Sequence, residues 1–260
     1  MSSATPGATV TAPSRYAEAV ARLGQAQKSA KGAPAYSRFV NRPLGRRLAA
    51  AAHVLGRTPN QVTAASAVCT AAGIAVLALV TPAWWTGLLV GALLVLGYGL
   101  DAADGQLARL RGGGSAVGEW LDHVVDAAKT ATLHLAVLIG AYRTWDPRPE
   151  AWLLVPLVFS AVASTWFFTI ILNDHLRRAA GTRDGQAVVR AGEARQHSRL
   201  RSLASVPVDY GVLCLVMLLA GWPAVFAWVY GALAAGFVLV TAASMVSWYR
   251  QVDALGRGTS

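Results

Sequence analysis

Five carboxylates gather between residues 101 and 126, and their spacing suggests a shared chemical task. Asp101, Asp104, Glu119, Asp122 and Asp126 are five of the chain's 13 acidic residues. Asp101 and Asp104 stand three residues apart and Asp122 and Asp126 four apart, so each pair shares a helix face. A Gly-Gly-Gly-Ser turn between the pairs would let a helical hairpin bring all four aspartates together. Such oxygen donors suit Mg²⁺ or Mn²⁺, and two ions could clamp a phosphate or diphosphate for in-line displacement.

The neighbouring histidines and Glu119 are not expected to belong to this cluster. His123 follows Asp122 directly, so it is predicted to point away from Asp122 and Asp126. His134 lies deep in an apolar segment and is predicted to be buried and hydrogen-bonded rather than a ligand. Glu119 falls in the first turn of its helix, where an acid is favourable in any case. Structural ion pairing of the aspartates remains open, although the stretch offers few partners: Arg109, Arg111 and Lys129.

The composition indicates an integral membrane protein. Hydrophobic residues make up 55% of the 260 residues and charged residues 14%, compared with about 25% in soluble domains. The mean hydropathy is +0.43. Disorder is excluded because it needs low hydrophobicity and high charge, and a disulfide scaffold because there are only two cysteines. The net charge is +10, and the basic residues responsible for it lie between the apolar segments. This placement favours a membrane surface over nucleic acid as their partner.

Six apolar segments are long enough to be considered as membrane spans, which need about 20 residues each. The expected fold is therefore all-α: a polytopic membrane protein with six transmembrane helices. The fifth segment is short, and Pro207 is expected to mark its start. The six segments are 61–80, 84–103, 118–141, 151–172, 206–221 and 223–247.

Lysine and arginine predict the orientation of these spans. They concentrate before the first span, between spans two and three, between spans four and five, and in the tail. The loops of the opposite side hold only Arg143 and Arg148. By the positive-inside rule both termini are cytoplasmic, and a site near residue 110 opens toward the cytoplasm. The expected location is the cell (inner) membrane.

The N-terminal part divides into two segments ahead of the membrane domain. Residues 1–35 are expected to be disordered or weakly structured. Residues 36–57 mix arginines with apolar residues and predict an interfacial amphipathic helix, with a short solvated helix or an organellar transit peptide as alternatives. Thr58 and Pro59 predict the start of the first span, by capping and by occupying the first helical position. Residues 58–250 form the expected catalytic domain and 251–260 a tail.

The full motif resembles that of the CDP-alcohol phosphotransferase (CDP-alcohol phosphatidyltransferase) family. The entry to the first span, Thr58-Pro59-Asn60-x-x-Thr63, resembles the family as well. The likeness supports the region from about 40 to 250 and does not reach residues 1–35. The motif reads Asp101-x-x-Asp104-Gly105-x-x-Ala108-Arg109, eight residues, then Gly118-x-x-x-Asp122-x-x-x-Asp126.

The resemblance implies an enzyme of phospholipid biosynthesis that moves a phosphatidyl group from CDP-diacylglycerol to an acceptor hydroxyl and releases CMP. It implies a homodimer in which the four motif aspartates bind two Mg²⁺ or Mn²⁺ ions. Asp126 would be the general base. The cytidine diphosphate would contact Asp101, Gly105, Ala108, Arg109 and Gly118.

The acceptor is the least specified partner. Glycerol 3-phosphate or inositol phosphate would require cations near the metals. Lys129 lies on the face of Asp126 and is either an acceptor ligand or the charge partner of Asp126. The end of the fourth span, Asn173-Asp174-His175-Leu176-Arg177-Arg178, could also line an acceptor pocket, with Arg177 and Arg178 as further candidates. A solvated helix end is the commoner reason for cations there and is the preferred interpretation. Ala127 stands where many members carry Lys or Arg, which leaves the phosphoglycerol subtype open.

Two other functions are consistent with parts of the sequence. The same chemistry could act on a soluble CDP-polyol for envelope polymer synthesis. From a different class, a divalent-cation transporter could use the carboxylates as its pathway. Transporters usually carry internal repeats with matched broken helices, and the sequence has no such repeat.

Overall fold

The computed structural model describes residues 14–25, 34–147, 150–184 and 206–257. These residues form helices joined by short turns and include no strand, so the predicted all-α class is confirmed. In chain order the helices are α1 (Arg15–Gln25), π-helical η1 (Ser37–Asn41), α2 (Arg42–Val54), α3 (Pro59–Leu79), α4 (Trp84–Leu110), α5 (Ala116–Thr144), the 3-10 turn η2 (Glu150–Leu153), α6 (Leu154–Asp184), α9 (Tyr210–Val216), the 3-10 turn η3 (Met217–Gly221) and α10 (Pro223–Arg257).

Five helices of the described part are long and apolar enough to cross a membrane, which makes the chain a multi-pass membrane protein. They are Pro59–Leu79, Trp84–Leu110, Ala116–Thr144, Glu150–Ala180 and Pro223–Leu255. The predicted count of six is not confirmed.

The remaining predicted span, 206–221, is a shorter apolar helix over Tyr210–Gly221. It begins at Tyr210 rather than near Pro207, because the Asp209 side chain caps it by accepting from the Gly211 amide at 3.0 Å. The last turn is 3-10. Twelve residues in α-helical geometry cover about 18 Å, less than the roughly 30 Å of bilayer hydrocarbon.

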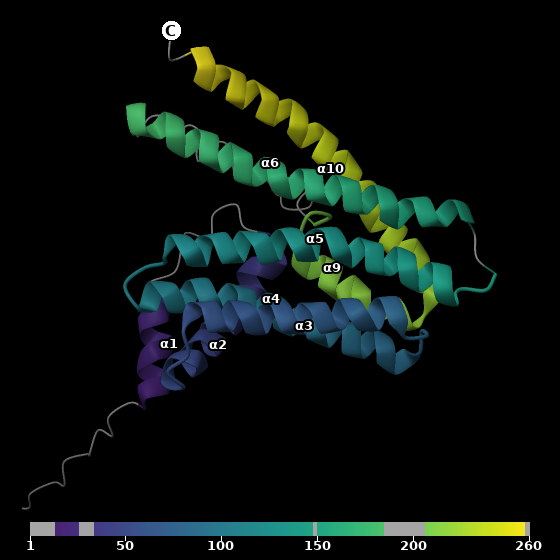
Figure 1. Cartoon of the computed structure of the whole chain (residues 1–260), viewed down its shortest axis with the longest axis horizontal. Coiled ribbons are helices and arrows are strands. Elements are labelled where there is room, and N and C mark those ends of the chain that lie inside the picture. The colour runs from purple at the N-terminus through teal and green to yellow at the C-terminus, as the bar shows by residue number, and fades with distance from the viewer. Residues whose placement is uncertain (1–13, 26–33, 148–149, 185–205, 258–260) are drawn as a thin grey trace, which may run out of the picture.

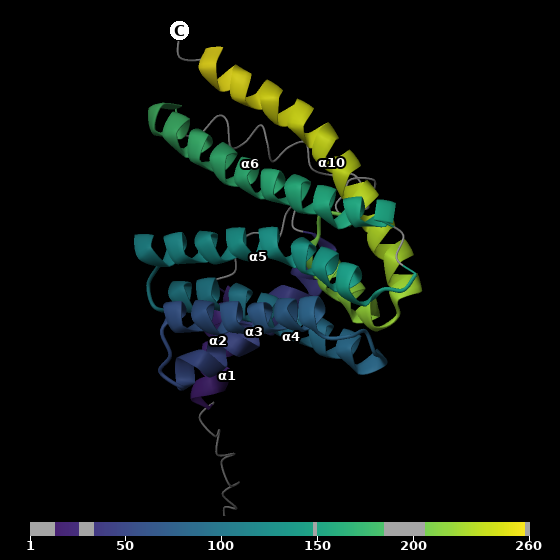
Figure 2. The ribbon, with the colours of Figure 1, turned by 45° about the vertical axis from the view of Figure 1, so that its right-hand side comes forward.

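Helices α3, α4 and α5 lie side by side, and α6 and α10 pack together above them (Figures 1 and 2). Small residues let the first three approach closely, as is common between helices in membranes. The Ser66 hydroxyl of α3 donates to the Gly97 carbonyl of α4 at 2.8 Å. A methyl group on Gly140 of α5 would run into the Leu77 carbonyl of α3. Helix α3 is therefore held close to both α4 and α5, the two helices that carry the aspartates.

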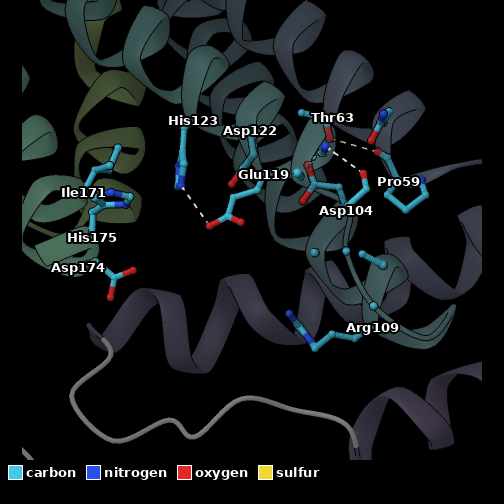
Figure 3. Close-up of a pocket in the computed structure, with 18 of the residues that line it drawn as sticks. Pro59, Thr63, Asp104, Arg109, Glu119, Asp122, His123, Ile171, Asp174 and His175 are labelled. Carbon is cyan, nitrogen blue, oxygen red and sulfur yellow. Dashed lines mark hydrogen bonds and ion pairs between the residues drawn. The ribbon is translucent and has the colours of Figure 1, made fainter. Parts of the chain in front are cut away.

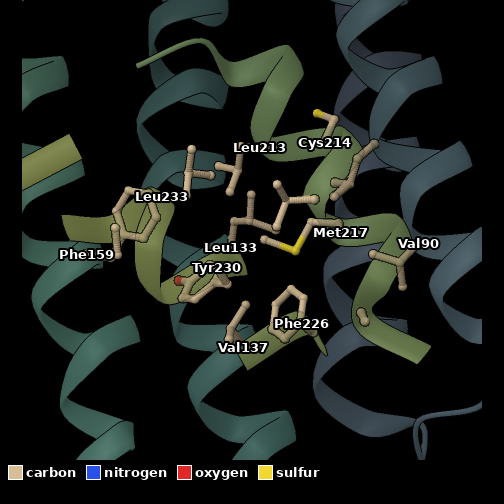
Figure 4. Close-up of a cluster of buried hydrophobic side chains, with 14 of the residues drawn as sticks. Val90, Leu133, Val137, Phe159, Leu213, Cys214, Met217, Phe226, Tyr230 and Leu233 are labelled. Atoms are coloured by element: carbon tan, nitrogen blue, oxygen red, sulfur yellow. The ribbon is translucent and has the colours of Figure 1, made fainter. Parts of the chain in front are cut away.

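A large buried cluster joins α4, α5, α6, α9, η3 and α10 (Figure 4). Phe159, Met217 and Tyr230 are among its fully buried side chains. His134 stacks on Phe159 with ring centroids 3.9 Å apart, and its Nδ1 lies 2.8 Å from the Tyr230 hydroxyl. The prediction that His134 is a buried, hydrogen-bonded residue is thus confirmed, and its role is structural.

The N-terminal region contains one described helix. Residues 1–35 were expected to be disordered or weakly structured, and α1 lies within them. Ala19 and Leu23, four residues apart, are buried in a cluster with Ala49 and Ala50 of α2, and this packing stabilises α1. Residues 1–13 and 26–33 lie outside the described part. For 36–57 the structure gives η1 and α2, while its interfacial location stays a prediction.

Candidate active site

The predicted helical hairpin is present and carries the aspartate motif. Helix α4 continues seven residues beyond the expected end at 103, to Leu110, so Asp101 and Asp104 lie within it. Gly112 and Gly113 then adopt φ of 100° and 138°, a region that side-chain-bearing residues rarely enter. Ser115 caps α5 by accepting from the Gly118 amide at 3.1 Å. The chain therefore reverses sharply, and the two aspartate pairs face each other from adjacent helices.

Asp104 is fixed by the start of α3. Thr58 and Gln61 form the capping box that begins this helix, as the sequence predicted for Thr58. One turn later the Thr63 hydroxyl donates to Oδ2 of Asp104 at 2.6 Å. Asp104 is only 7% exposed, yet it borders a cavity. One carboxylate oxygen of Asp104 is thus bound by the Thr63 hydroxyl.

Asp101 and Asp126 share a cation. The Lys129 ammonium lies 2.9 Å from Oδ1 of Asp101 and 2.5 Å from Oδ1 of Asp126. Its Nζ also lies 5.4 Å from the centre of the Tyr210 ring on α9. Of the two roles considered for Lys129, these contacts are those of a charge partner. They also bring Asp101 of α4 next to Asp126 of α5.

Asp122 and Asp126 form a group with His123, which corrects the prediction that His123 points away. One ligand atom from each of the three lies within 4.8 Å of the others. His123 Nε2 also lies 3.9 Å from Oε1 of Glu119. The imidazole is long enough to reach back across the 100° that separates successive residues on a helix. Figure 3 shows Asp122, His123 and Glu119 projecting from α5 into the same open space.

That space is a cavity of about 1410 Å³, open on one side. Its motif wall consists of Asp104, Gly105, Ala108, Arg109, Gly118 and Asp122. Asp101, Asp126 and Lys129 are not part of the lining. Four of the five residues expected to contact the nucleotide therefore line the cavity, namely Gly105, Ala108, Arg109 and Gly118. The fifth, Asp101, is not part of the lining.

Small residues give the motif wall its shape. A Cβ atom on Gly118 would lie 3.2 Å from the Ser115 hydroxyl and 3.3 Å from Oδ1 of Asn60. A Cβ on Gly105 would lie 3.6 Å from an Arg109 terminal nitrogen. The Arg109 Nε has no hydrogen-bond partner in the part of the chain that is described. A ligand in the cavity could therefore approach the backbone of this wall closely. The neighbouring Arg109 guanidinium has N–H groups that could donate hydrogen bonds to it.

Helix α6 supplies the opposite wall, which the sequence suggested only in part. The stretch around Arg177 and Arg178 was interpreted as a solvated helix end, but the helix continues to Asp184, and its side chains line the cavity. Arg178 pairs with Glu119 of α5 at 3.0 Å and with Asp174 at 2.6 Å. Arg177 donates to Oε1 of Gln251 on α10 at 2.6 Å. The wall residues of α6 are Ile170, Ile171, Asn173, Asp174, His175, Arg177 and Arg178.

Two of these wall residues, Asn173 and His175, belong to the stretch that was considered as an acceptor pocket but interpreted as a solvated helix end. Asn173 is 6% exposed, and its Nδ2 has no partner among the described residues. The available signal was the appearance of Asn-Asp-His directly after an apolar run, at a depth where polar side chains are expensive. Nothing in the spacing of the aspartate motif pointed to a helix 50 residues further along the chain.

The donor set fits a hard divalent cation. Asp104 and Asp122 supply carboxylate oxygens to the cavity lining, and Asp126 and the His123 nitrogen lie within 4.8 Å of the Asp122 ligand atom. Asp101 and Asp122 are close enough to Asp104 to repel its charge, as is Asp101 to Asp126. Clustered carboxylates of this kind need cations to offset their repulsion, and Lys129 provides only part of that charge.

The fold and site define a multi-pass membrane enzyme whose carboxylates meet at a half-open cavity between helices. Residues 57–240 match the family described as CDP-alcohol phosphatidyltransferase, and the chain belongs to that family. The predicted resemblance is thereby confirmed, and the cation-transporter alternative receives no support.

A curated relative is archaetidylinositol phosphate synthase of Pyrococcus horikoshii. It is 35% identical over 92 residues, which are 35% of this chain and 46% of the relative. The chain thus matches about half the length of this relative.

Proposed function

We propose that the chain transfers a phosphatidyl group from CDP-diacylglycerol to a hydroxyl of a small polar acceptor, with release of CMP. The proposal rests mainly on the cavity. Residues of the family motif form one of its walls, and polar residues of α6 form the other. A volume of about 1410 Å³ exceeds the roughly 300–1,000 Å³ typical of small-ligand pockets and leaves room for a nucleotide together with an acceptor. A site between membrane helices also suits a donor with acyl chains.

The motif wall would bind the donor. Gly105, Ala108 and Gly118 leave backbone accessible to the nucleotide, and Arg109 offers guanidinium donors to its phosphates. Asp101 is not part of the cavity lining, and in this structure its carboxylate contacts Lys129. These roles rest on the family motif, and the presence of Gly105, Ala108, Arg109 and Gly118 in the cavity lining supports them.

The motif aspartates would also hold Mg²⁺ or Mn²⁺, in the number of two that the family resemblance implies. Asp104 and Asp122 face the cavity, and Asp126 lies next to Asp122. When bound, the ions supply positive charge that offsets the diphosphate charge and stabilises the leaving CMP.

The reaction would proceed by displacement at the phosphorus that bears the lipid. The acceptor hydroxyl oxygen forms a bond to this phosphorus, and the bond from it to the bridging oxygen breaks, so CMP leaves with that oxygen. Asp126 would take the hydroxyl proton. Arg109 would stabilise the charge that develops on CMP.

The polar wall on α6 would bind the acceptor. Arg177 and Arg178 are the cations available there, and both also have carboxylate or amide partners. Asn173 adds an amide donor that is free in the described structure. Glycerol 3-phosphate and inositol phosphate remain the proposed acceptors, because each presents both hydroxyl and phosphate groups.

The proposal also includes the oligomeric state of the protein and its location in the cell. A homodimer in the cell membrane, with the cavity open to the cytoplasm, agrees with the family resemblance and with the basic loops near Arg109 and Arg177. The alternative of a soluble CDP-polyol donor uses the same cavity and the same residues.

A CMP-release assay of the purified chain tests the proposal. CDP-diacylglycerol should support release only when an acceptor is added, with glycerol 3-phosphate, inositol phosphate, inositol and serine screened in parallel. A CDP-polyol offered with the same acceptors is the matched control for the donor. Faster release from the soluble donor would favour envelope polymer synthesis, and no release from either donor would reject the proposal.

A further inference from the structure

His123 is a nitrogen donor beside two of the motif aspartates, and neither the motif nor the comparisons give it a role. It lines the cavity together with Asp122. One ligand atom each from Asp122, His123 and Asp126 lies within 4.8 Å of the other two. Two ligands on opposite sides of a divalent ion, each bound at about 2.1 Å, are about 4.2 Å apart. The three residues are therefore spaced so that small side-chain movements would let them share one ion.

The two ring nitrogens of His123 have different surroundings. Nε2 lies 3.9 Å from Oε1 of Glu119, an approach that Figure 3 marks with a dashed line. Nδ1 is buried and has no hydrogen-bond partner among the described residues, although 42% of the side chain is exposed. Burying a polar atom without a partner costs free energy, so a ligand at Nδ1 would account for its position.

Glu119 lies on the Nε2 side of the ring and is itself held in place. Its Oε1 atom also accepts a hydrogen bond from Arg178 of α6 at 3.0 Å. A carboxylate on this side favours the tautomer with its proton on Nε2, which leaves the lone pair on Nδ1. Histidines that bind metal ions commonly direct their other ring nitrogen at a carboxylate. The surroundings of His123 thus match those of a metal ligand.

The nitrogen donor also affects which ion is preferred. Mg²⁺ takes oxygen ligands in nearly ideal octahedral geometry, whereas imidazole nitrogen is a ligand of transition-metal ions. A position built from two carboxylates and one imidazole should therefore bind Mn²⁺ more tightly than Mg²⁺.

We propose that Nδ1 of His123 is a ligand of the divalent ion held by Asp122 and Asp126, and that this nitrogen makes the position selective for Mn²⁺ over Mg²⁺. Glu119 is the positioning residue that orients the ring. This role rests on the proposed function, because it adds a ligand to the two-ion site of the motif aspartates and leaves their roles unchanged. It assigns His123 to the metal and not to the acceptor.

Electron spin-echo envelope modulation of bound Mn²⁺ tests the ligand directly, because a coordinated imidazole produces a ¹⁴N modulation. The full-length protein in detergent, loaded with Mn²⁺ alone, should show this modulation, and protein produced with ¹⁵N-histidine should lose it. His123→Phe keeps a planar ring without nitrogen and should lose the modulation as well. His175→Phe removes an imidazole that lines the same cavity from α6 and is the matched control, which should keep it.

Competition between the two ions tests the selectivity. Electron paramagnetic resonance of the released ion measures the concentration of Mg²⁺ needed to displace the most tightly held Mn²⁺. This concentration should fall by about 10-fold or more in His123→Phe, because the loss of a nitrogen ligand weakens the binding of Mn²⁺ more than that of Mg²⁺. His175→Phe should need as much Mg²⁺ as the unaltered chain, and an equal requirement in His123→Phe would contradict the selectivity.

Bound Mn²⁺ without ¹⁴N modulation in the unaltered chain, or modulation that persists in His123→Phe, would overturn the assignment of His123 as a ligand. The unaltered chain with and without ¹⁵N-histidine decides ligation by histidine even if His123→Phe does not fold, and His123→Gln gives a second variant without an imidazole. CMP release by the same preparations separates the two proposals. Release without ¹⁴N modulation contradicts only the role of His123, whereas modulation without release contradicts only the enzymatic function. A lack of Mn²⁺ binding by every preparation overturns the ligand role and the metal site together.

Discussion

The four motif aspartates differ in their immediate surroundings. Asp104 is buried and receives a hydrogen bond from Thr63, whereas Asp122 faces the cavity beside His123. Asp101 and Asp126 contact Lys129. The four carboxylates thus have different neighbours. Differences in environment of this kind allow chemically identical groups to take different roles in a reaction.

Asp126→Asn tests the base at this scale. The amide keeps the shape of the side chain but cannot accept the acceptor's proton, so CMP release should fall by at least about 100-fold. The protein should still elute from size exclusion as the unaltered chain does. Asp146→Asn, in the turn at the other end of α5, is the matched control and should retain activity. Turnover by Asp126→Asn within a few-fold of the unaltered chain would remove Asp126 as the base.

Thr63→Val tests the support of Asp104. A hydrogen bond to a charged group contributes roughly 1.5–3 kcal/mol, so its loss should lower kcat/KM by about 10- to 100-fold. Thr132→Val is the control, because among the described residues the Thr132 hydroxyl of α5 donates to a carbonyl of its own helix, at 2.7 Å, and to no carboxylate. Equal kinetics for the two variants would show that Thr63 does not orient Asp104 for the reaction.

Residue spacing predicted the aspartates but not all of their neighbours. Helical periodicity places Asp101, Asp104, Asp122 and Asp126 on facing sides, and the contacts agree with that arrangement. The same periodicity gave the wrong direction for His123, because an angle around a helix takes no account of how far an imidazole reaches. The role of Lys129 was left between two alternatives, since only the tertiary contact with Asp101 separates them.

Among the elements, the site depends on close packing of α3 against α4 and of α3 against α5. Gly97 and Gly140 allow the backbones of α4 and α5 to approach that of α3. Thr63 can reach Asp104 only because these helices are so near. The glycines along the helices therefore contribute to the geometry of the carboxylates, although they touch no ligand.

Gly140→Ala tests this packing away from the cavity. The added methyl group meets the Leu77 carbonyl, so the helices must separate, and the free energy of unfolding should fall by about 1–3 kcal/mol. Gly231→Ala in α10 is the control, since a Cβ there has nothing within 4 Å and alanine favours a helix by up to about 1 kcal/mol. Thermal unfolding in detergent measures both. A Gly140→Ala protein as stable as Gly231→Ala would argue against close packing of α3 and α5.

Hydropathy predicted the long helices well and the irregular elements poorly. The breaks at Pro82 and at the glycine turn agree with the helix ends, because backbone chemistry decides them locally. The segment 206–221 forms a helix only after the cap at Asp209 and ends in a 3-10 turn, features that an average of hydrophobicity does not register. Helix α1 depends on packing against α2, which composition alone could not reveal.

At the scale of the whole molecule, the cavity lies at the end of the helices that carries the basic loops. Its lining includes Arg109, Arg111, Arg177 and Arg178, whereas the turn between α5 and α6 lies at the other end. Charge distribution and site position therefore point to the same side of the membrane. The acceptors proposed above are soluble and would reach the cavity from that side.

Cysteine labelling tests this orientation. In a background with Cys69→Ala and Cys214→Ala, Gly114→Cys marks the α4–α5 turn and Glu150→Cys the α5–α6 turn. A membrane-impermeant maleimide should label Gly114→Cys in inverted vesicles and Glu150→Cys in right-side-out vesicles. The reverse pattern would place the cavity on the outer face and contradict the cytoplasmic assignment.

The carboxylates and the cavity are proposed to carry out metal-dependent phosphatidyl transfer. The most direct measurement quantifies CMP and the phosphatidyl product together, by mass spectrometry, from one reaction of the purified chain with CDP-diacylglycerol and its best acceptor. We expect equal amounts of both products, loss of both in EDTA, and recovery of both with Mg²⁺ or Mn²⁺. Undiminished products in EDTA, or metal uptake by proteoliposomes without any CMP, would contradict the account.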